Sequence, residues 1–136
     1  MTKKNNGILT YAIIGFYLIS LFTESFTGGG GIIGILTLIF GGLSILMLKI
    51  TAFGAWSANI LFFVVLIKKS QIETKLILSG ISVILGFLAL FVTDLPMHMG
   101  STTSPVKIGI GFYFWIASLI LLFNKSLIDY LKVRKK

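Results

Sequence analysis

Few residues in this sequence could carry out acid–base or metal chemistry. The chain contains one histidine, His98, no cysteine and four Asp or Glu residues. His98 follows Asp94 closely and Glu24 ends the first apolar run, but a zinc site needs three or four ligands. The hydroxyl groups of residues 101–104 accompany no recognisable nucleophile motif. We therefore predict a non-catalytic protein without a metal or other cofactor, in which Glu24, Asp94 and His98 are loop residues.

Asn59 is the most distinctive polar residue inside an apolar run, and it lies in the segment Trp56-Ser-Ala-Asn59. This spacing places the side chains of Trp56 and Asn59 on the same face of a helix. An amide in hydrocarbon needs a hydrogen-bond partner, so we predict that Asn59 bonds to a neighbouring helix. The alternative is that Asn59 lines a ligand or ion path. Lys49 directly precedes the same run, where its ammonium group can reach the membrane interface.

The composition indicates an integral membrane protein. Of the 136 residues, 56% are hydrophobic and 12% are charged, and the mean hydropathy is +1.01. Soluble domains carry roughly 25% charged residues, and a chain of this size cannot hide so much apolar surface in its own core. The net charge of +8 would suggest nucleic acid in a soluble protein. Here the basic residues stand at the ends of apolar runs, where they set topology and meet anionic headgroups, so we expect a lipid bilayer as partner and no nucleic acid.

The elements that must position Asn59 are five apolar runs in a single polytopic membrane domain. Four consecutive glycines, Gly28 to Gly31, separate the first run from the second, and further glycines interrupt the second. The sequence predicts an all-α membrane protein: a bundle of four transmembrane helices plus one short Gly-rich helix that is intramembrane or interfacial. The alternative is five transmembrane helices. The runs are residues 8–23, 32–48, 50–67, 76–93 and 108–123, and a basic tail follows at 124–136.

The distribution of Lys and Arg favours the fold with four crossings. If residues 28–67 cross the membrane once, ten basic residues fall on one side, Lys107 alone falls on the other, and Lys49 is unassigned. Five crossings would place eight on one side and four on the other. Because an excess of Lys and Arg in short loops marks the cytoplasmic side, we predict that both termini are cytoplasmic.

Small residues mark the fourth run as a packing element. Ser79, Ser82 and Gly86 recur at spacings of three and four, which places them on one face of a helix. Small side chains let helix backbones approach closely in lipid. We therefore predict that this stripe faces other helices of the bundle.

Two short segments carry a resemblance to known proteins. Trp56-Ser-Ala-Asn59 and, later, Gly111-Phe-Tyr-Phe-Trp115-Ile-Ala-Ser118 resemble the W-x-A-N-P and G-Y-x-x-W-x-A-S segments of an uncharacterised group of small bacterial polytopic inner-membrane proteins. Ile60 stands where that pattern has proline, which removes the helix break expected after Asn59. The resemblance implies no activity. It implies a location in the bacterial inner (plasma) membrane and one packed cluster formed by Trp56, Asn59, Gly111, Trp115 and Ser118.

Two functions compete on the sequence alone. The first is a non-catalytic protein that binds another membrane component, either as an accessory subunit or as an immunity-type protein, with another membrane protein or a second copy as partner. The second is a small oligomeric transporter or channel. Proton-coupled transporters usually place an acidic residue in mid-membrane, whereas the four acids here stand at run ends or in loops, which favours the first function.

Overall fold

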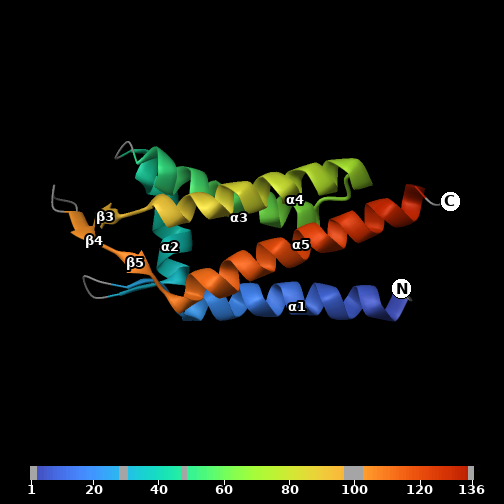
Figure 1. Ribbon diagram of the computed structural model, residues 1–136, viewed down its shortest axis with the longest axis horizontal. Coiled ribbons are helices and arrows are strands. Elements are labelled where there is room, and N and C mark those ends of the chain that lie inside the picture. Colours follow the sequence, from blue (N-terminus) through green and yellow to red (C-terminus); the bar gives the residue numbers. More distant parts are fainter. Residues whose placement is uncertain (1–2, 28–30, 47–48, 97–102, 135–136) are drawn as a thin grey trace.

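Four long helices run along the longest axis of the molecule, and a short helix lies across one end of them (Figure 1). The computed structural model describes residues 3–27, 31–46, 49–96 and 103–134. Two 3-10 helices extend the α-helices, one after the short helix and one after the third long helix. The helices are α1 (Lys3–Phe22), α2 (Gly34–Phe40), η1 (Gly41–Ile45), α3 (Ile50–Ile67), α4 (Ile72–Phe87), η2 (Leu88–Phe91) and α5 (Ile110–Arg134).

The long helices pack in the order α1, α5, α4, α3, with close approaches between successive members of that series. The first and last members, α1 and α3, meet mainly through aromatic rings: Tyr17 stacks on Phe62 with ring centroids 4.4 Å apart and meets Phe63 edge-on at 5.4 Å. Phe16, on another face of α1, stacks on Phe114 of α5 at 5.8 Å. The bundle is thus tight on three sides and looser along the α1–α3 seam.

In the part of the chain that the structure describes, three helices are long and apolar enough to cross a membrane: α3, α4 with its extension to Phe91, and α5. The apolar part of α1, Gly7–Phe22, and the α2–η1 pair, Gly34–Ile45, are shorter. Within the run at residues 32–48, α2 has seven residues and η1, which contains Gly41 and Gly42, has five. At 1.5 Å per residue α2 is about 10 Å long. The prediction of a short helix in this glycine-containing run is therefore confirmed.

Two small antiparallel sheets close the end of the molecule at which α2 lies, and the all-α prediction was wrong in leaving them out. One sheet has the order β2-β1-β5 and the other pairs β3 with β4. The sheet strands form because loop backbones between helices pair with one another instead of with water. The strands are β1 (Glu24–Thr27), β2 (Ile32–Ile33), β3 (Asp94–Pro96), β4 (Thr103–Pro105) and β5 (Lys107–Ile108).

Two glycines allow the helices to meet the sheet closely. A methyl group on Gly34, the first residue of α2, would collide with the carbonyl oxygen of Ser20 in α1, and one on Gly109 would collide with that of Glu24. Backbone hydrogen bonds join the same segments, from Gly34 N to Thr23 O at 3.0 Å and from Gly109 N to Ser25 O at 2.9 Å. These contacts fix the ends of α1, α2 and α5 to one another.

The stripe of small residues on α4 is buried, which confirms its predicted packing role. Ser79, Ser82 and Gly86 are the buried residues of this helix. The hydroxyl of Ser82 donates to the carbonyl oxygen of Ala58 on α3 at 3.0 Å. A methyl group on Gly86 would lie 2.8 Å from side-chain carbons of α5. The stripe therefore lies against both neighbours of α4.

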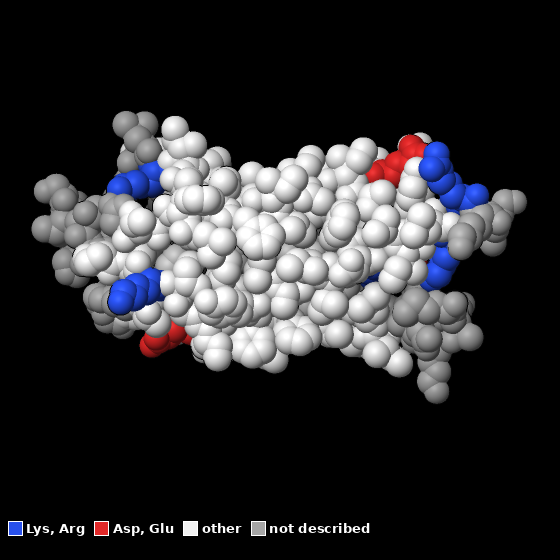
Figure 2. Space-filling view, in the orientation of Figure 1, with Lys and Arg blue, Asp and Glu red and all other residues white. Residues whose placement is uncertain are grey.

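In the view of Figure 2, the charged side chains of the described residues lie toward the two ends of the molecule, and most of the surface between them is uncharged. The N-terminus, the C-terminus and the α3–α4 loop share one end, and the sheets occupy the other (Figure 1). The last helix continues into the basic tail, because α5 reaches Arg134 without a break. There Asp129 pairs with Lys125 at 3.1 Å and Lys132 at 3.7 Å.

Candidate functional site

Asn59 joins three helices through its amide group. It lies on α3 and is 8% exposed. Its Nδ2 donates to the carbonyl oxygen of Trp56 in its own helix at 2.9 Å, which holds the amide in one orientation. Its Oδ1 accepts two hydrogen bonds, from Tyr17 Oη of α1 at 2.9 Å and from Trp115 Nε1 of α5 at 2.8 Å. Both acceptor sites of the amide oxygen are thus occupied by donors from other helices.

Trp56 fixes the short helix to α3. Its indole Nε1 donates to the carbonyl oxygen of Leu38 in α2 at 2.7 Å. The indole ring lies over two glycines of η1: a methyl group on Gly41 would lie 2.6 Å from Trp56 Cδ1, and one on Gly42 would lie 3.0 Å from Cζ2. Phe53 stacks on the ring with centroids 5.8 Å apart. The glycines that interrupt the second apolar run therefore leave space for the indole ring to pack against the backbone of η1.

A cavity of about 70 Å³, lined by both Trp56 and Trp115, lies at the sheet end of the bundle. A buried water needs roughly 10–15 Å³ of such volume, so the cavity has room for several waters or one small apolar molecule. Its walls are mostly apolar, and the polar groups that reach it are neutral. Among the lining residues, those with a polar side chain are Tyr17, Ser20, Ser25, Thr37, Trp56, Asn59 and Trp115.

Of the five residues that the resemblance placed in one cluster, the structure brings three together. Trp56, Asn59 and Trp115 are linked by hydrogen bonds and line the same cavity. Gly111 lies elsewhere, where a methyl group would be 2.8 Å from the carbonyl oxygen of Thr23. Ser118 is fully buried, and its hydroxyl donates within α5 to the carbonyl oxygen of Trp115 at 2.7 Å. Gly111 and Ser118 thus support the helix that carries Trp115.

The sequence analysis missed Tyr17, which supplies the α1 donor to Asn59. It also missed the packing of the Trp56 ring against Gly41 and Gly42. The buried hydroxyl of Ser20 donates to the carbonyl oxygen of Tyr17 at 2.6 Å and lies one turn further along α1. To find Tyr17 from the sequence, one would have to choose the polar side chain of another run that faces Asn59. The first run contains several polar residues, and the sequence does not show which of them turns toward α3.

The loop candidates do not gather into a site in the part of the chain that the structure describes. Glu24 is exposed at the start of β1, and Asp94 begins β3. The side chain of Asp94 and the whole of His98 lie outside the described residues. Within residues 3–27, 31–46, 49–96 and 103–134, no group of three or more His, Cys, Asp or Glu residues could hold a metal ion.

No family model, curated protein or solved structure matches this chain. The resemblance to bacterial inner-membrane proteins is therefore supported only in its coarsest part. The chain is a small, mostly helical protein with three helices that are long and apolar enough to cross a membrane.

Proposed function

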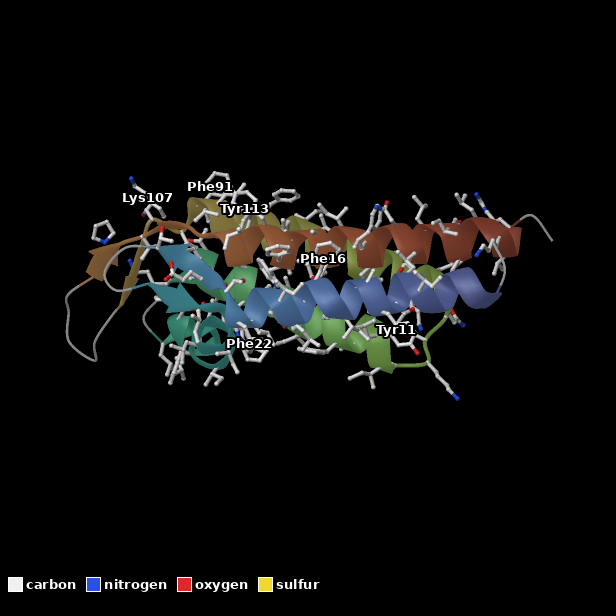
Figure 3. All side chains as sticks on the ribbon, turned by 90° about the horizontal axis from the view of Figure 1, so that it is seen from below. Tyr11, Phe16, Phe22, Phe91, Lys107 and Tyr113 are labelled. Atoms are coloured by element: carbon white, nitrogen blue, oxygen red, sulfur yellow. The ribbon has the colours of Figure 1, made fainter. Side chains whose placement is uncertain are left out.

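We propose that this chain is an integral membrane protein that crosses the bilayer four times, through α1, α3, α4 and α5. The first support is the apolar surface along these helices. Tyr11 and Phe22 of α1 are 77% and 73% exposed, and Ile84 of α4 and Tyr113 of α5 are 68% and 62% exposed. Figure 3 shows Tyr11 and Phe22 on one side of the bundle and Phe91 and Tyr113 on the other. The second support is length: α3, α4 with its extension to Phe91, and α5 are long and apolar enough to cross a membrane, and the apolar part of α1, Gly7–Phe22, makes about 24 Å of the roughly 30 Å of the hydrocarbon core.

In this proposal both termini are cytoplasmic. The end with the termini and the α3–α4 loop holds most of the basic residues, whereas Lys107 lies in β5 at the opposite end and Lys49 precedes α3 there. Lys49 thus joins Lys107 on the less basic side, and an excess of Lys and Arg marks the cytoplasmic side. The basic residues next to the cytoplasmic helix ends are Lys3, Lys4, Lys68, Lys69, Lys75, Lys125, Lys132, Arg134, Lys135 and Lys136.

Cysteine labelling tests this topology, because the chain has no cysteine of its own. We expect a membrane-impermeant maleimide to label Thr27→Cys in intact cells and to label Ser70→Cys only after the membrane is opened. Ser70 lies in the α3–α4 loop and Thr27 in β1. Labelling of Ser70→Cys alone in intact cells would reverse the orientation, and labelling of both would rule out the four crossings.

We further propose a non-catalytic role: the protein binds another membrane component, as an accessory subunit or an immunity-type protein. The observation that carries this is that every buried side-chain nitrogen or oxygen in the described residues has a hydrogen-bond partner. The buried polar groups bond to a neighbouring helix or within their own helix, and none of those in the described residues is left over for a substrate. What the molecule offers to others is then its apolar helix surface.

Site-specific photocrosslinking in native membranes tests this role. A photoreactive phenylalanine analogue would replace one exposed residue on each helix, namely Tyr11, Ile60, Ile84 or Tyr113, and the buried Phe62 would serve as the control position. A partner gives one protein adduct of constant mass, strong from one face and absent from Phe62. Adducts of the chain with itself alone, together with solute flux in liposomes, would favour an oligomeric transporter or channel instead.

A further inference from the structure

The loose seam between α1 and α3 forms a groove of about 450 Å³. This volume lies within the range of roughly 300–1,000 Å³ typical of pockets for small molecules. One wall is a stripe along α1 that includes Ile14 and Leu18, and the other is the last part of α3. The lining residues are Thr10, Ile14, Tyr17, Leu18, Leu21, Phe62, Phe63, Leu66 and Ile67.

The groove has the length of one leaflet of a bilayer. From Thr10 to Leu21, α1 advances by about 16 Å at 1.5 Å per residue, whereas half of the hydrocarbon core is about 15 Å. Tyr17 and Leu21 line both the groove and the cavity at the sheet end. The hydrogen bond from Tyr17 to Asn59 holds the phenol ring in place between the two spaces. Tyr17 therefore forms a fixed part of the groove wall, and Leu21 continues the lining toward the sheet end.

The walls of the groove suit a flexible hydrocarbon chain better than another helix. Close helix packing in lipid relies on small side chains, whereas this lining consists almost entirely of large aliphatic and aromatic residues. Leu18, Phe63 and Ile67 stay 48%, 39% and 78% exposed, so the groove opens sideways toward the surroundings of the bundle. A lipid acyl chain can follow such an uneven surface, but the backbone of a helix cannot approach it.

Two lysines stand at the end of the groove that faces the α3–α4 loop. Ile67 is the last residue of α3, and the exposed Lys68 and Lys69 follow it directly. Lysines at the membrane surface attract anionic headgroups. Positive charge thus stands at this end of the groove, where a lipid phosphate can lie.

We propose that the α1–α3 groove binds one anionic phospholipid of the cytoplasmic leaflet. One of its acyl chains lies between α1 and α3 along the groove, and its phosphate lies at Lys68 and Lys69. This inference rests on the membrane location and orientation proposed above.

Native mass spectrometry of the purified protein tests the proposal. The protein is reconstituted with phosphatidylglycerol and phosphatidylcholine of identical acyl chains, and the lipid retained per protein is measured after detergent release. We expect one retained phosphatidylglycerol per chain and at least a fivefold preference over phosphatidylcholine. The double variant Lys68→Gln/Lys69→Gln should bring that preference close to one, since the two lysines near the surface contribute about 1 kcal/mol each. The matched control is Lys49→Gln/Lys107→Gln, which removes the same charge at the opposite end.

A second pair of variants tests the groove itself. Leu18→Trp fills the groove and should abolish retention of both lipids. Ile19→Trp should leave retention unchanged, because Ile19 is the next residue of the same helix, is 46% exposed and does not line the groove. Thermal melting of each variant in detergent checks that it is folded.

Three results would overturn the lipid site. The first is equal retention of both lipids, and the second is an equal loss in both double variants. The third is a dimer signal that Leu18→Trp removes while lipid retention persists, which would assign the groove to a second copy of the chain. Failure of the proposed function looks different, because the wild-type chain would then be absent from the membrane fraction.

Discussion

The two halves of the helix bundle are held together by different means. In the half next to the sheets, polar side chains cross from one helix to another, as the bonds to Asn59 and from Trp56 to Leu38 show. In the half next to the termini, the buried hydroxyls of Ser79 and Ser126 donate within their own helices. The sheet-side half comprises residues 13–22, 50–59, 82–91 and 110–119, and the terminal half comprises residues 3–12, 60–67, 72–81 and 120–134.

This difference indicates where the arrangement of the helices is specified. Lipid tails are as apolar as leucine, so burial of apolar surface gives little drive for helices to associate in a membrane. Hydrogen bonds and close packing must then select the partners and the depth of each helix. The sheet-side half supplies both, whereas the terminal half of α3 borders the groove that separates it from α1. Substitutions in the two halves should therefore differ in their effects on stability.

Asn59→Leu should have the largest effect. It removes the acceptor of two buried donors, Tyr17 Oη and Trp115 Nε1, and leaves both unsatisfied. The expected loss is about 2 kcal/mol in the free energy of unfolding, measured by titration with a denaturing detergent. Asn124→Leu, an exposed asparagine in the terminal half, is the control and should change stability little. Equal losses in the two variants would remove the distinction between the halves.

Gly41→Ala should rank second. The added methyl group would lie 2.6 Å from Trp56 Cδ1, so either the indole ring or the α2–η1 segment must shift. Overpacking of this kind costs about 1–3 kcal/mol. Gly15→Ala is the matched control, because a methyl group there meets nothing within 4 Å and should stabilise the helix by up to about 1 kcal/mol. Thermal melting of both variants in the same detergent gives the comparison, and a loss for Gly15→Ala would contradict it.

Tyr17→Phe should cost less, about 0.6–1 kcal/mol, which is typical of one hydrogen bond between helices in a membrane. The ring stack on Phe62 is retained, and only the donor to Asn59 is lost. The control is Tyr11→Phe, at a side chain that is 77% exposed. A double-mutant cycle sharpens this test: Tyr17→Phe should cost nothing further in the Asn59→Leu background, and additive losses would show that the two residues act independently.

The smallest effects should come from the serines, and here the two halves can be compared with one substitution type. Ser82→Ala removes a bond from α4 to the carbonyl oxygen of Ala58 on α3 and should cost about 0.6 kcal/mol. Ser126→Ala removes a bond within α5, to the carbonyl oxygen of Leu122, and should fall within about 0.5 kcal/mol of zero. Unfolding free energies from the same detergent titration decide the order, and a larger loss for Ser126→Ala would reverse it.

The features predictable from the sequence were those carried by a single run of residues. Ser79, Ser82 and Gly86 predicted a packed face because their spacing alone defines it. The short Gly-rich helix was predictable because Gly41 and Gly42 weaken a helix locally and because Lys49 leaves little room for a turn. The burial of Asn59 among helices was predictable from the apolar residues around it in the sequence.

The partner of Asn59 could not be predicted in the same way. Tyr17 and Asn59 are 42 residues apart, and α1 is apolar on all its faces, so no stripe shows which side of it turns inward. Tyr11 and Tyr17 look alike in the sequence, yet the structure exposes the first and buries the second. That choice depends on the rotation of α1 against α5, which is set by packing between distant segments.

The strands were unpredictable for a related reason. Glu24–Thr27 pairs on one side with Ile32–Ile33 and on the other with Lys107–Ile108. These segments are too short to show alternation, and their pairing follows from the helix ends that the bundle brings together. Gly109 is informative only after the fold is known, because its missing side chain admits the carbonyl oxygen of Glu24.

The packing of α1 against α5 has a consequence for how the protein is made. Of the five helices, α1 is synthesised first and α5 last, yet each is the other's main neighbour. At about 5–20 residues per second, several seconds pass between the end of α1 and the start of α5. During this time α3 and α4 can already join as a hairpin, whereas in the proposed topology α1 stays in the membrane before α5 is available to pack against it. In that topology its insertion depends on its own sixteen apolar residues, Gly7–Phe22, rather than on contacts with the rest of the bundle.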